Sequence, residues 1–356
     1  MTFHATVQPV SREAAALARE RIDQLTKPVG SLGRIEELAE RLAAIARMIP
    51  TTNYERRVIV IGAGDHGVTQ ARVSAYPCEV TAQMVGGFLS GTAAISAFAR
   101  TVRAEVYVAN FGVAAEIADA PNLINVPIAR GTRNFVQGPA MSAPQVDAAI
   151  EAGVALFERL QGTQQLEIIA LGEMGIGNTT SAAALICALT GTAPEDIVGR
   201  GTGVDDATLQ RKIAAVATGV ARCDKDDWHQ CAQQVGGFEI LGLAGIMLAA
   251  AQAGIPIILD GYIVTAAALV ASRIAPEVVP YCIASHRSRE LGHAYVLRHL
   301  GLLPLFDLDL RLGEATGAAL AFPFIEAAAR MIREMKTFAE AGVSTASAEP
   351  EALTVS

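Results

Sequence analysis

One glutamate lies in a sequence setting that suits proton transfer. Glu314 stands in RLGEATGAALAF, where Leu312, Ala318 and Phe322 would partly desolvate its carboxylate. Desolvation raises a carboxyl pKa toward neutrality, which is the range that a general base needs. A glutamate that merely complements the dipole of the following helix is the structural alternative. The motif makes Glu314 a candidate base on these grounds.

Two glycine-rich segments suit a phosphate group. In GEMGIGNTTSAAA (172–184), Asn178, Thr179 and Thr180 stand where a helix should begin, and free backbone N–H groups at that point form an anion site together with the hydroxyls. In VGRGTGVDDATLQRK (198–212), glycines precede a helix that carries Lys212. An ordinary capped turn and a solvated lysine are the alternatives. Neither segment is a Walker A loop, because no GK[ST] occurs.

The histidines and acids predict no metal site. None of the 6 histidines stands in a zinc-ligand spacing, and Asp65–His66 is expected to be a hydrogen-bonded pair at a strand end. PIILDGYIVTAAA resembles the diphosphate loop of type I phosphoribosyltransferases, but Asp260 has no adjacent acid and no Thr-Gly pair follows it. We therefore expect neither a metal nor another cofactor.

The elements that must position these residues alternate between short apolar runs and long Ala-rich helical segments. Strands alternating with helices predict a parallel sheet, whose strands are buried on both faces. Polar residues and glycines follow the runs, and ligands bind beyond the carboxyl ends of such strands. This pattern predicts one site assembled from many loops. The predicted strands are Val58–Ile61, Val106–Ala109, Ile168–Leu171, Ile255–Leu259 and Val278–Ala284.

The two ends of the chain have a helical pattern. Apolar spacing predicts helices over Ser11–Leu25 and Ser31–Met48, with Ser31 capping the second after Pro28 and Gly30 end the first. The C-terminal part from Arg287 is also expected to be helical.

Composition excludes several classes of protein. A length of 356 residues suits two domains, and 51% hydrophobic against 18% charged residues excludes general disorder. A net charge of −8 argues against nucleic acid or an anionic membrane as partner. Ile240–Leu259 is better explained by a buried helix and strand than by a membrane span. Five scattered cysteines and no signal-like N-terminus predict a cytoplasmic protein with reduced thiols.

Eight motifs follow one another along the chain, namely KPVGSLGR, GAGDHGV, RGTRNF, GPAMS, GEMGIGNTT, VGGFEILGLAG, ILDGYIVTAAAL and RLGEATGAALA. In this order they resemble the motifs of the nicotinate-nucleotide–dimethylbenzimidazole phosphoribosyltransferases of cobalamin lower-ligand assembly. The resemblance implies a pentosyltransferase that moves the 5-phosphoribosyl group of nicotinate mononucleotide to 5,6-dimethylbenzimidazole with inversion at the anomeric carbon. It also implies a homodimer and a Rossmann-like large domain (56–330) with a small helical domain from both chain ends (1–55 with 331–356).

The same resemblance implies roles for individual residues. Glu314 matches the catalytic base, and Glu173 and Lys212 match two further site residues. The phosphoribosyl group is assigned to one set of positions, namely Gly175, Asn178, Thr179, Thr180, Gly201, Gly203 and Ser285. The acceptor base is assigned to a second set, namely Tyr76, Gln83, Met84 and Leu312. Tyr76 stands where enteric members have Ser, their pocket Gln aligns with Met84, and Asn110 replaces an expected Asp.

Three alternatives remain open from the sequence. The acceptor could be another lower-ligand base, such as a substituted benzimidazole, a purine or a phenol. A dinucleotide-dependent oxidoreductase would share the sheet and the glycine-rich turns, although the dinucleotide fingerprint is absent. A non-catalytic nucleotide-binding protein could use the same scaffold, since fold does not imply function.

Overall fold

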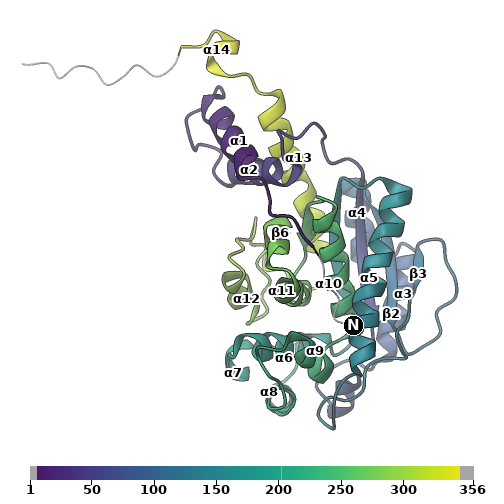
Figure 1. The fold of residues 1–356 in the computed structure, drawn as a ribbon. Helices are drawn as coiled ribbons and strands as arrows, with labels where there is room; N and C mark the ends of the chain where they lie inside the picture. Colours follow the sequence, from purple (N-terminus) through teal and green to yellow (C-terminus); the bar gives the residue numbers. More distant parts are fainter. Residues whose placement is uncertain (1–5, 202, 345–356) are drawn as a thin grey trace, which may run out of the picture. The chain divides into compact units, whose positions relative to one another are not determined.

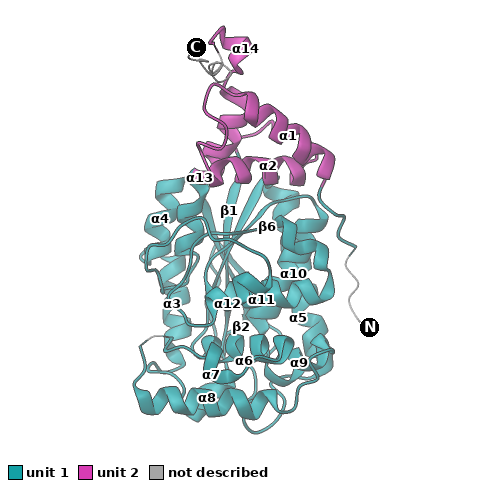
Figure 2. Ribbon diagram, turned by 90° about the vertical axis from the view of Figure 1, so that its left-hand side faces the viewer, with its two compact units in different colours: residues 1–10, 54–323 teal, residues 11–53, 324–356 magenta. Residues whose placement is uncertain are grey.

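The computed structural model describes residues 6–201 and 203–344. These residues form two compact units, coloured separately in Figure 2. Unit 1 comprises the described residues up to Val10 together with Tyr54–Pro323, and unit 2 comprises Ser11–Asn53 with the described residues from Phe324. The boundaries between the units therefore fall at 53/54 and 323/324, beside the predicted 55/56 and 330/331, and the segment before Ser11 belongs to the large unit.

Unit 1 is built on a parallel sheet, which confirms the predicted α/β fold (Figure 1). All pairings are parallel and the strand order is β3-β2-β1-β4-β5-β6. This is the order of doubly wound nucleotide-binding sheets, in which strands are added outward on one side of β1 and then, from β4, on its other side. The strands are β1 (Arg57–Gly64), β2 (Glu105–Gly112), β3 (Leu123–Asn125), β4 (Ile168–Met174), β5 (Ile257–Leu259) and β6 (Cys282–Ala284).

Helices cover both faces of this sheet. Figure 2 shows α3 (Glu79–Leu89) and α4 (Ala94–Val102) on one side, and α5 (Ala143–Gln164) and α10 (Phe238–Gln252) on the other. Close helix packing depends on glycines, because a Cβ on Gly153 would lie 2.0 Å from the Gly242 carbonyl oxygen. The other elements of unit 1 are η1 (Gly67–Ala71), α6 (Asn178–Thr190), α7 (Pro194–Ile197), α8 (Asp206–Val220), α9 (Trp228–Val235), α11 (Tyr262–Ile274), η2 (Pro276–Tyr281) and α12 (His293–His299).

The structure corrects some predicted boundaries. The expected strand Val278–Ala284 is mostly the 3-10 helix η2, and only Cys282–Ala284 joins the sheet, because Pro280 has no N–H for a ladder. The short strand β3 lacked a sequence signal. Ile240–Leu259 forms a buried helix followed by a strand, as predicted. Within the described chain, Glu79–Val102 alone has the length and composition of a membrane span, and it consists of the two helices α3 and α4.

Unit 2 is helical and contains α1 (Arg12–Gln24), α2 (Arg34–Ala46), α14 (Phe338–Ala341) and the part of α13 (Thr316–Glu334) that follows Pro323. Ser11 caps α1 by accepting from the Ala14 N–H. The prediction that Ser31 caps α2 is wrong, since the helix begins at Arg34 and Gly33 takes the cap position. Glu36, in the first turn of α2, instead accepts a hydrogen bond from the Leu32 N–H of the preceding loop at 3.0 Å.

Candidate active site

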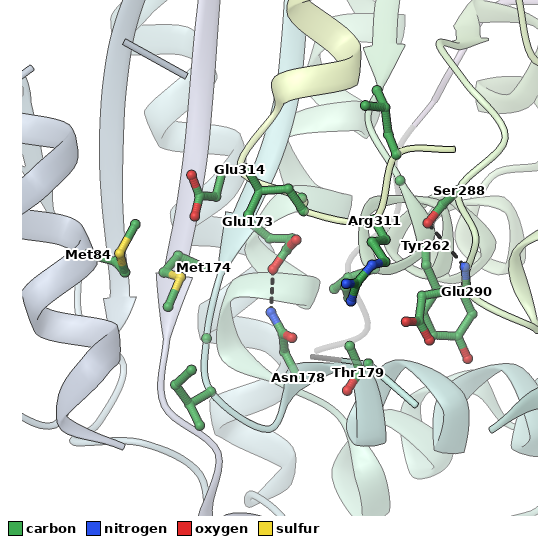
Figure 3. A pocket seen from close by; sticks show the side chains of 18 of the residues that line it. Met84, Glu173, Met174, Asn178, Thr179, Tyr262, Ser288, Glu290, Arg311 and Glu314 are labelled. Atoms are coloured by element: carbon green, nitrogen blue, oxygen red, sulfur yellow. Dashed lines mark hydrogen bonds between the residues drawn. The ribbon is translucent and has the colours of Figure 1, made fainter. Parts of the chain in front are cut away.

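A cavity of about 730 Å³ lies in unit 1, beyond the carboxyl ends of β4, β5 and β6. This is the edge where the sequence placed its polar residues, and it is where open α/β sheets bind ligands. Figure 3 shows Glu173, Glu314 and Asn178 together, with Met84 on one side and Glu290 on the other. Strand ends, the start of α6, helix α3 and the segment before α13 all contribute side chains.

The turn between β4 and α6 carries the first acid of the site. Glu173 is the next-to-last residue of β4, and α6 begins at Asn178, as the sequence predicted. Gly177 has a φ of 96°, which lets the chain turn sharply into the helix. Asn178 donates to the Glu173 carboxylate through its side-chain amide, so the first residue of the helix fixes the acid behind it.

Glu314 is held in a strained segment. Gly313, Glu314 and Ala315 have φ values of 82°, 60° and 62°, all in the left-handed region that non-glycine residues avoid. A Cβ on Gly313 would lie 2.3 Å from a Glu173 carboxylate oxygen, so only glycine fits at that point. Ala315 packs on Gly172 of β4 in a similarly close contact. Such strain persists where surrounding structure enforces it, and it is concentrated at functional sites.

Three carboxylates share this edge of the sheet without a cationic partner. Burial raises the pKa of Glu173 to about 8; the hydrogen bond from Asn178 opposes that shift, and repulsion from Asp260, Glu239 and Glu314 adds to it. Burial and then Asp260 raise the pKa of Glu314 to about 7. Among the ion pairs of the described residues, none includes Glu173, Glu314 or Asp260. This part of the cavity is thus suited to a cation or to a proton.

Asp260 is an acid of the site to which the sequence assigned no role. It follows β5 directly and is buried, and it accepts the Ala318 N–H of α13 at 2.9 Å. Burial raises its pKa, while His286 and backbone N–H groups oppose that shift. Its second carboxylate oxygen is buried and has no hydrogen-bond partner in the described structure. The available signal was an acid placed immediately after an apolar strand.

The opposite end of the cavity carries the cation and the hydroxyls. Lys212 donates to the Thr179 hydroxyl at 3.1 Å, and a Cβ on Gly201 would lie 3.1 Å from the Lys212 ammonium nitrogen. Burial lowers the pKa of Lys212, and Glu290 opposes that shift. Arg311 extends toward this region in Figure 3. Helix α6, a lysine and a glycine-rich loop therefore converge here, as an anion site requires.

An apolar wall closes the side next to α3. Val80 and Met84 on that helix line the cavity, and Ile176 and Leu312 face it from the β4 turn and from the segment before α13. Tyr76 stands before the helix and is 51% exposed. A flat aromatic ring would fit such a wall, with a tyrosine hydroxyl available at its rim.

The cavity gathers most of the predicted site residues. Those that line it are Glu314, Glu173, Gly175, Asn178, Thr179, Gly201, Tyr76, Met84 and Leu312. Five predicted residues do not line it. Lys212 lies behind Thr179, Thr180 is fully buried in α6, and Gln83 is exposed on α3. Gly203 is exposed in its loop, and the buried Ser285 hydroxyl contacts His286 instead.

Several lining residues had no predicted role from the sequence. Tyr262 opens α11, and Ser288 and Glu290 follow β6, where His286 also lines the cavity. The Glu290 N–H is held by the Ser288 hydroxyl, and both the Tyr262 hydroxyl and one Glu290 oxygen are buried without a hydrogen-bond partner in the described structure. His286, Ser288 and Glu290 come from the loop after β6, whose path the sequence pattern does not specify.

Asp65 and His66 are hydrogen-bonded, as expected of a strand-end pair. Asp65 accepts the Ala114 N–H at 2.8 Å, and His66 contacts Ser181 and Glu239. Over residues 6–201 and 203–344, no group of three or more His, Cys, Asp or Glu side chains is arranged to hold a metal ion.

Comparison with known proteins identifies close relatives. A phosphoribosyltransferase family model matches residues 7–343. The nicotinate-nucleotide–dimethylbenzimidazole phosphoribosyltransferase of Desulforamulus reducens is 48% identical over 341 residues, covering 95% of this chain and 97% of the relative. The enzyme of that name from Roseiflexus sp. is 49% identical over 346 residues, covering 96% of each. A crystal structure of CobT from Thermus thermophilus superposes with a TM-score of 0.90 at 48% identity, covering 93% of this chain and 99% of that one.

Proposed function

Since the chain belongs to the family of nicotinate-nucleotide–dimethylbenzimidazole phosphoribosyltransferases, we propose that it transfers the 5-phosphoribosyl group of nicotinate mononucleotide to 5,6-dimethylbenzimidazole. The products are nicotinate and α-ribazole 5′-phosphate, and the anomeric carbon inverts from β to α. The reaction builds the nucleotide loop of cobalamin. The bond between the anomeric carbon and the nicotinate nitrogen breaks, a bond to a benzimidazole nitrogen forms, and the proton on the other benzimidazole nitrogen is released.

One observation carries this proposal. Glu173 and Glu314 are buried carboxylates without a cationic partner in the lining of a cavity that Thr179 of α6 also lines, and Lys212 lies directly behind the Thr179 hydroxyl. Nicotinate mononucleotide has the matching polarity, since its pyridinium nitrogen is positive and its phosphate negative. The nucleotide would therefore lie with its glycosidic bond beside the acids and its phosphate at the helix N-terminus.

Glu314 is suited to remove the proton of the incoming base. One ring nitrogen of the benzimidazole attacks the anomeric carbon, and the N–H on its other nitrogen becomes acidic as the bond forms. A carboxylate with a pKa of about 7 is poised to accept that proton at neutral pH. Proton transfer of this kind contributes roughly 10²–10⁴-fold to a rate.

Glu173 is suited to stabilise the ribosyl group at the transition state. Nicotinate departs with the electrons of its glycosidic bond, which neutralises the ring nitrogen, so the leaving group needs neither a metal nor a general acid. Positive charge then develops on the ribose. A buried carboxylate stabilises such charge more strongly than a solvated one. The substrate cation would favour ionisation of Glu173, whose pKa burial raises to about 8.

Lys212 and the Thr179 hydroxyl, at the start of α6, are proposed to anchor the phosphate. Anchoring orients the anomeric carbon between the leaving and attacking nitrogens, which lowers the entropy cost of the reaction. The wall formed by Val80, Met84 and Leu312 would hold the acceptor ring. Substituted benzimidazoles, purines and phenols are alternative acceptors. Tyr76 places a hydroxyl at the rim of the cavity, and a hydrogen bond to that hydroxyl would favour one of these bases over the others.

The test is a direct transfer assay. Purified protein is incubated with nicotinate mononucleotide and 5,6-dimethylbenzimidazole without magnesium, and the products are separated by chromatography. We expect nicotinate and α-ribazole phosphate in equal amounts. If product forms only with another base from a panel, that base is the acceptor, and the residues around Tyr76 would be tested for its selection. Binding of the nucleotide without turnover for any base would contradict transfer and favour a non-catalytic binder.

We further propose that the protein is a cytoplasmic homodimer. The dimer rests on the family resemblance, and the cytoplasmic location on the scattered cysteines, none of which forms a disulfide with another in the described chain. Light scattering of the purified chain tests the dimer, and cell fractionation tests the location.

A further inference from the structure

A further buried acid, Glu239, lies beside the site and pairs with a histidine, unlike Glu173 and Glu314, which line the cavity. His66, which follows β1, places Nε2 2.7 Å from a Glu239 carboxylate oxygen and Nδ1 2.8 Å from the Ser181 hydroxyl. Both side chains of the ion pair are fully buried. At 2.7 Å, Nε2 and the Glu239 carboxyl oxygen share a hydrogen bond. Three separate elements, β1, α6 and α10, are thereby joined.

Glycines surround this pair on several sides. A Cβ on Gly175 would lie 3.3 Å from both Glu239 and the His66 ring, and 2.3 Å from the Gly64 carbonyl oxygen. Gly64 and Gly237 would each place a Cβ 2.9 Å from the second Glu239 oxygen. That oxygen is buried and has no hydrogen-bond partner in the described structure. The backbone at Gly64, Gly175 and Gly237 therefore packs directly against the His66 and Glu239 side chains, and these side chains determine where the backbone lies.

The backbone held in this way is the turn that carries the proposed chemistry. Gly175 lies two residues after Glu173 and three before Asn178, which donates to that acid. Ser181, the other partner of His66, is in the first turn of α6. On the opposite side, the buried Thr81 hydroxyl accepts the Ile176 N–H at 3.0 Å. The turn is thus fixed from two sides by side chains that do not line the cavity.

We propose that the His66–Glu239 pair is a positioning device that holds the turn Glu173–Gly177, and with it the start of α6, in the geometry needed for phosphoribosyl transfer. This rests on the proposed function for its catalytic consequence, but the positioning itself concerns only the turn. His66 and Glu239 act through Glu173 and the α6 N–H groups and do not touch the reacting atoms. A displacement of about 1 Å at a reacting group can lower a rate about 10²-fold, so a clamp of this kind governs turnover.

The pair also has an electrostatic consequence for Glu173. Three acids face that carboxylate, Asp260 at β5, Glu314 before α13 and Glu239 on α10, and each raises its pKa in addition to burial. Removing the Glu239 charge while keeping its shape would therefore lower the pKa of Glu173. A purely structural contact would leave that titration unchanged, which separates the two roles.

The test uses three variants and one matched control. His66→Asn breaks both ring hydrogen bonds, Ser181→Ala removes one of them, and Glu239→Gln keeps an acceptor but removes the charge. His229→Asn is the control, because His229 pairs with Asp147 at 2.9 Å between α9 and α5 and does not line the cavity. Amide hydrogen exchange over residues 174–180 measures the turn directly, and steady-state kinetics measures transfer.

In His66→Asn we expect amide exchange in the turn to rise and kcat to fall, each about tenfold or more, while KM for the nucleotide changes less than about threefold. Ser181→Ala should show a smaller change in the same direction, and it replaces His66→Asn if that variant does not fold. In Glu239→Gln the part of the pH–rate profile that depends on Glu173 should move to lower pH. His229→Asn should match the wild type within about twofold.

The outcomes distinguish this inference from the proposed function. Wild-type exchange and kcat in His66→Asn and Ser181→Ala, with Glu173→Gln impaired, would overturn the positioning role and leave the function intact. If the wild-type protein transfers phosphoribose to no base, amide exchange still decides the matter, because faster exchange in His66→Asn would uphold the clamp and unchanged exchange would reject it.

Discussion

Glu36 in the helical unit and Glu314 in the cavity are both buried carboxylates, yet their pKa values move in opposite directions. Burial alone would raise the pKa of Glu36, but Lys27, the Leu32 N–H and Arg19 outweigh it and lower the pKa. The Lys27 and Arg19 nitrogens lie 2.8 and 3.2 Å from the Glu36 carboxylate. Burial also raises the pKa of Glu314, and the neighbour that raises it further is another acid, Asp260.

The difference lies in compensation rather than in burial. A buried charge is costly unless partners satisfy it, so Glu36 with two cations and a backbone donor is a structural group. Glu173 and Glu314 lack cations in the described structure and hold a proton near neutral pH instead. Such groups are available to exchange protons or to meet a cationic ligand. Glu239, with His66, is of the compensated kind even though it lies beside the site.

The largest effect should come from Glu314→Gln. Glutamine keeps the size and removes the base, so we expect kcat to fall about 10²-fold or more while nucleotide binding is retained. Steady-state transfer assays and calorimetric binding measure the two quantities. Glu277→Gln, at an exposed position in η2, is the control. A folded Glu314→Gln enzyme with wild-type kcat would show that the uncompensated acid is not the base.

Breaking the compensated group should instead cost stability. Glu36→Ala leaves Lys27 buried without its partner, and loss of one member of a buried pair typically costs about 3 kcal/mol or more. Thermal or denaturant unfolding measures the loss. Glu37→Ala in the same helix is the control, since the Glu37 side chain is 64% exposed and should change stability by less than about 0.5 kcal/mol. Equal effects at the two positions would refute the contrast.

The sequence predicted the fold and the chemistry of the site better than its detailed shape. Apolar runs identified four of the strands, and the residues after them identified Glu173 and the start of α6, because parallel strands end at one edge. Glu290 was missed because a loop brings it to the cavity, and loop paths depend on tertiary contacts. Tyr262 lies in the motif ILDGYIVTAAAL, at the first position of α11, but had no predicted role. Ser285 was predicted to face the ligand, but its hydroxyl turns to His286.

The sequence also did not predict which of the buried acids have a cation or a hydrogen-bond donor as partner. Glu36 and Glu37 are adjacent in one helix, and only the three-dimensional positions of Lys27 and Arg19 make one of them buried and paired. Likewise, the sequence predicted that Asp65 and His66 are satisfied at a strand end but not by which groups, and the partners of His66 are Ser181 and Glu239, more than 100 residues away along the chain. Long-range partners set pKa values, and single-sequence patterns do not specify them.

A third prediction concerns stability at alkaline pH. Folded Glu173 keeps its proton up to about pH 8, whereas the unfolded group releases it near 4.5. The folded state therefore binds more protons between these values, and stability falls as pH rises through that window. Glu173→Gln stays neutral and still accepts from Asn178, so its stability relative to wild type should improve by about 3 kcal/mol from pH 6 to pH 9. Unfolding at both pH values measures this, and an unchanged difference would mean that Glu173 is ionised throughout.

The smallest effect, and the sharpest test of the comparison, is the pH dependence of transfer. If Glu314 is the base, kcat/KM for the acceptor should fall about tenfold per unit as pH drops below about 7, because protonation removes the acceptor of the N–H proton. The acceptor base titrates as well, so the wild-type profile is divided by that of Glu314→Gln, which lacks the carboxyl but shares the titration of the substrate. A midpoint near 7 in this ratio would confirm an uncompensated acid. A midpoint near the ordinary 4.5 would instead place Glu314 with Glu36, as a carboxylate that its surroundings keep ionised.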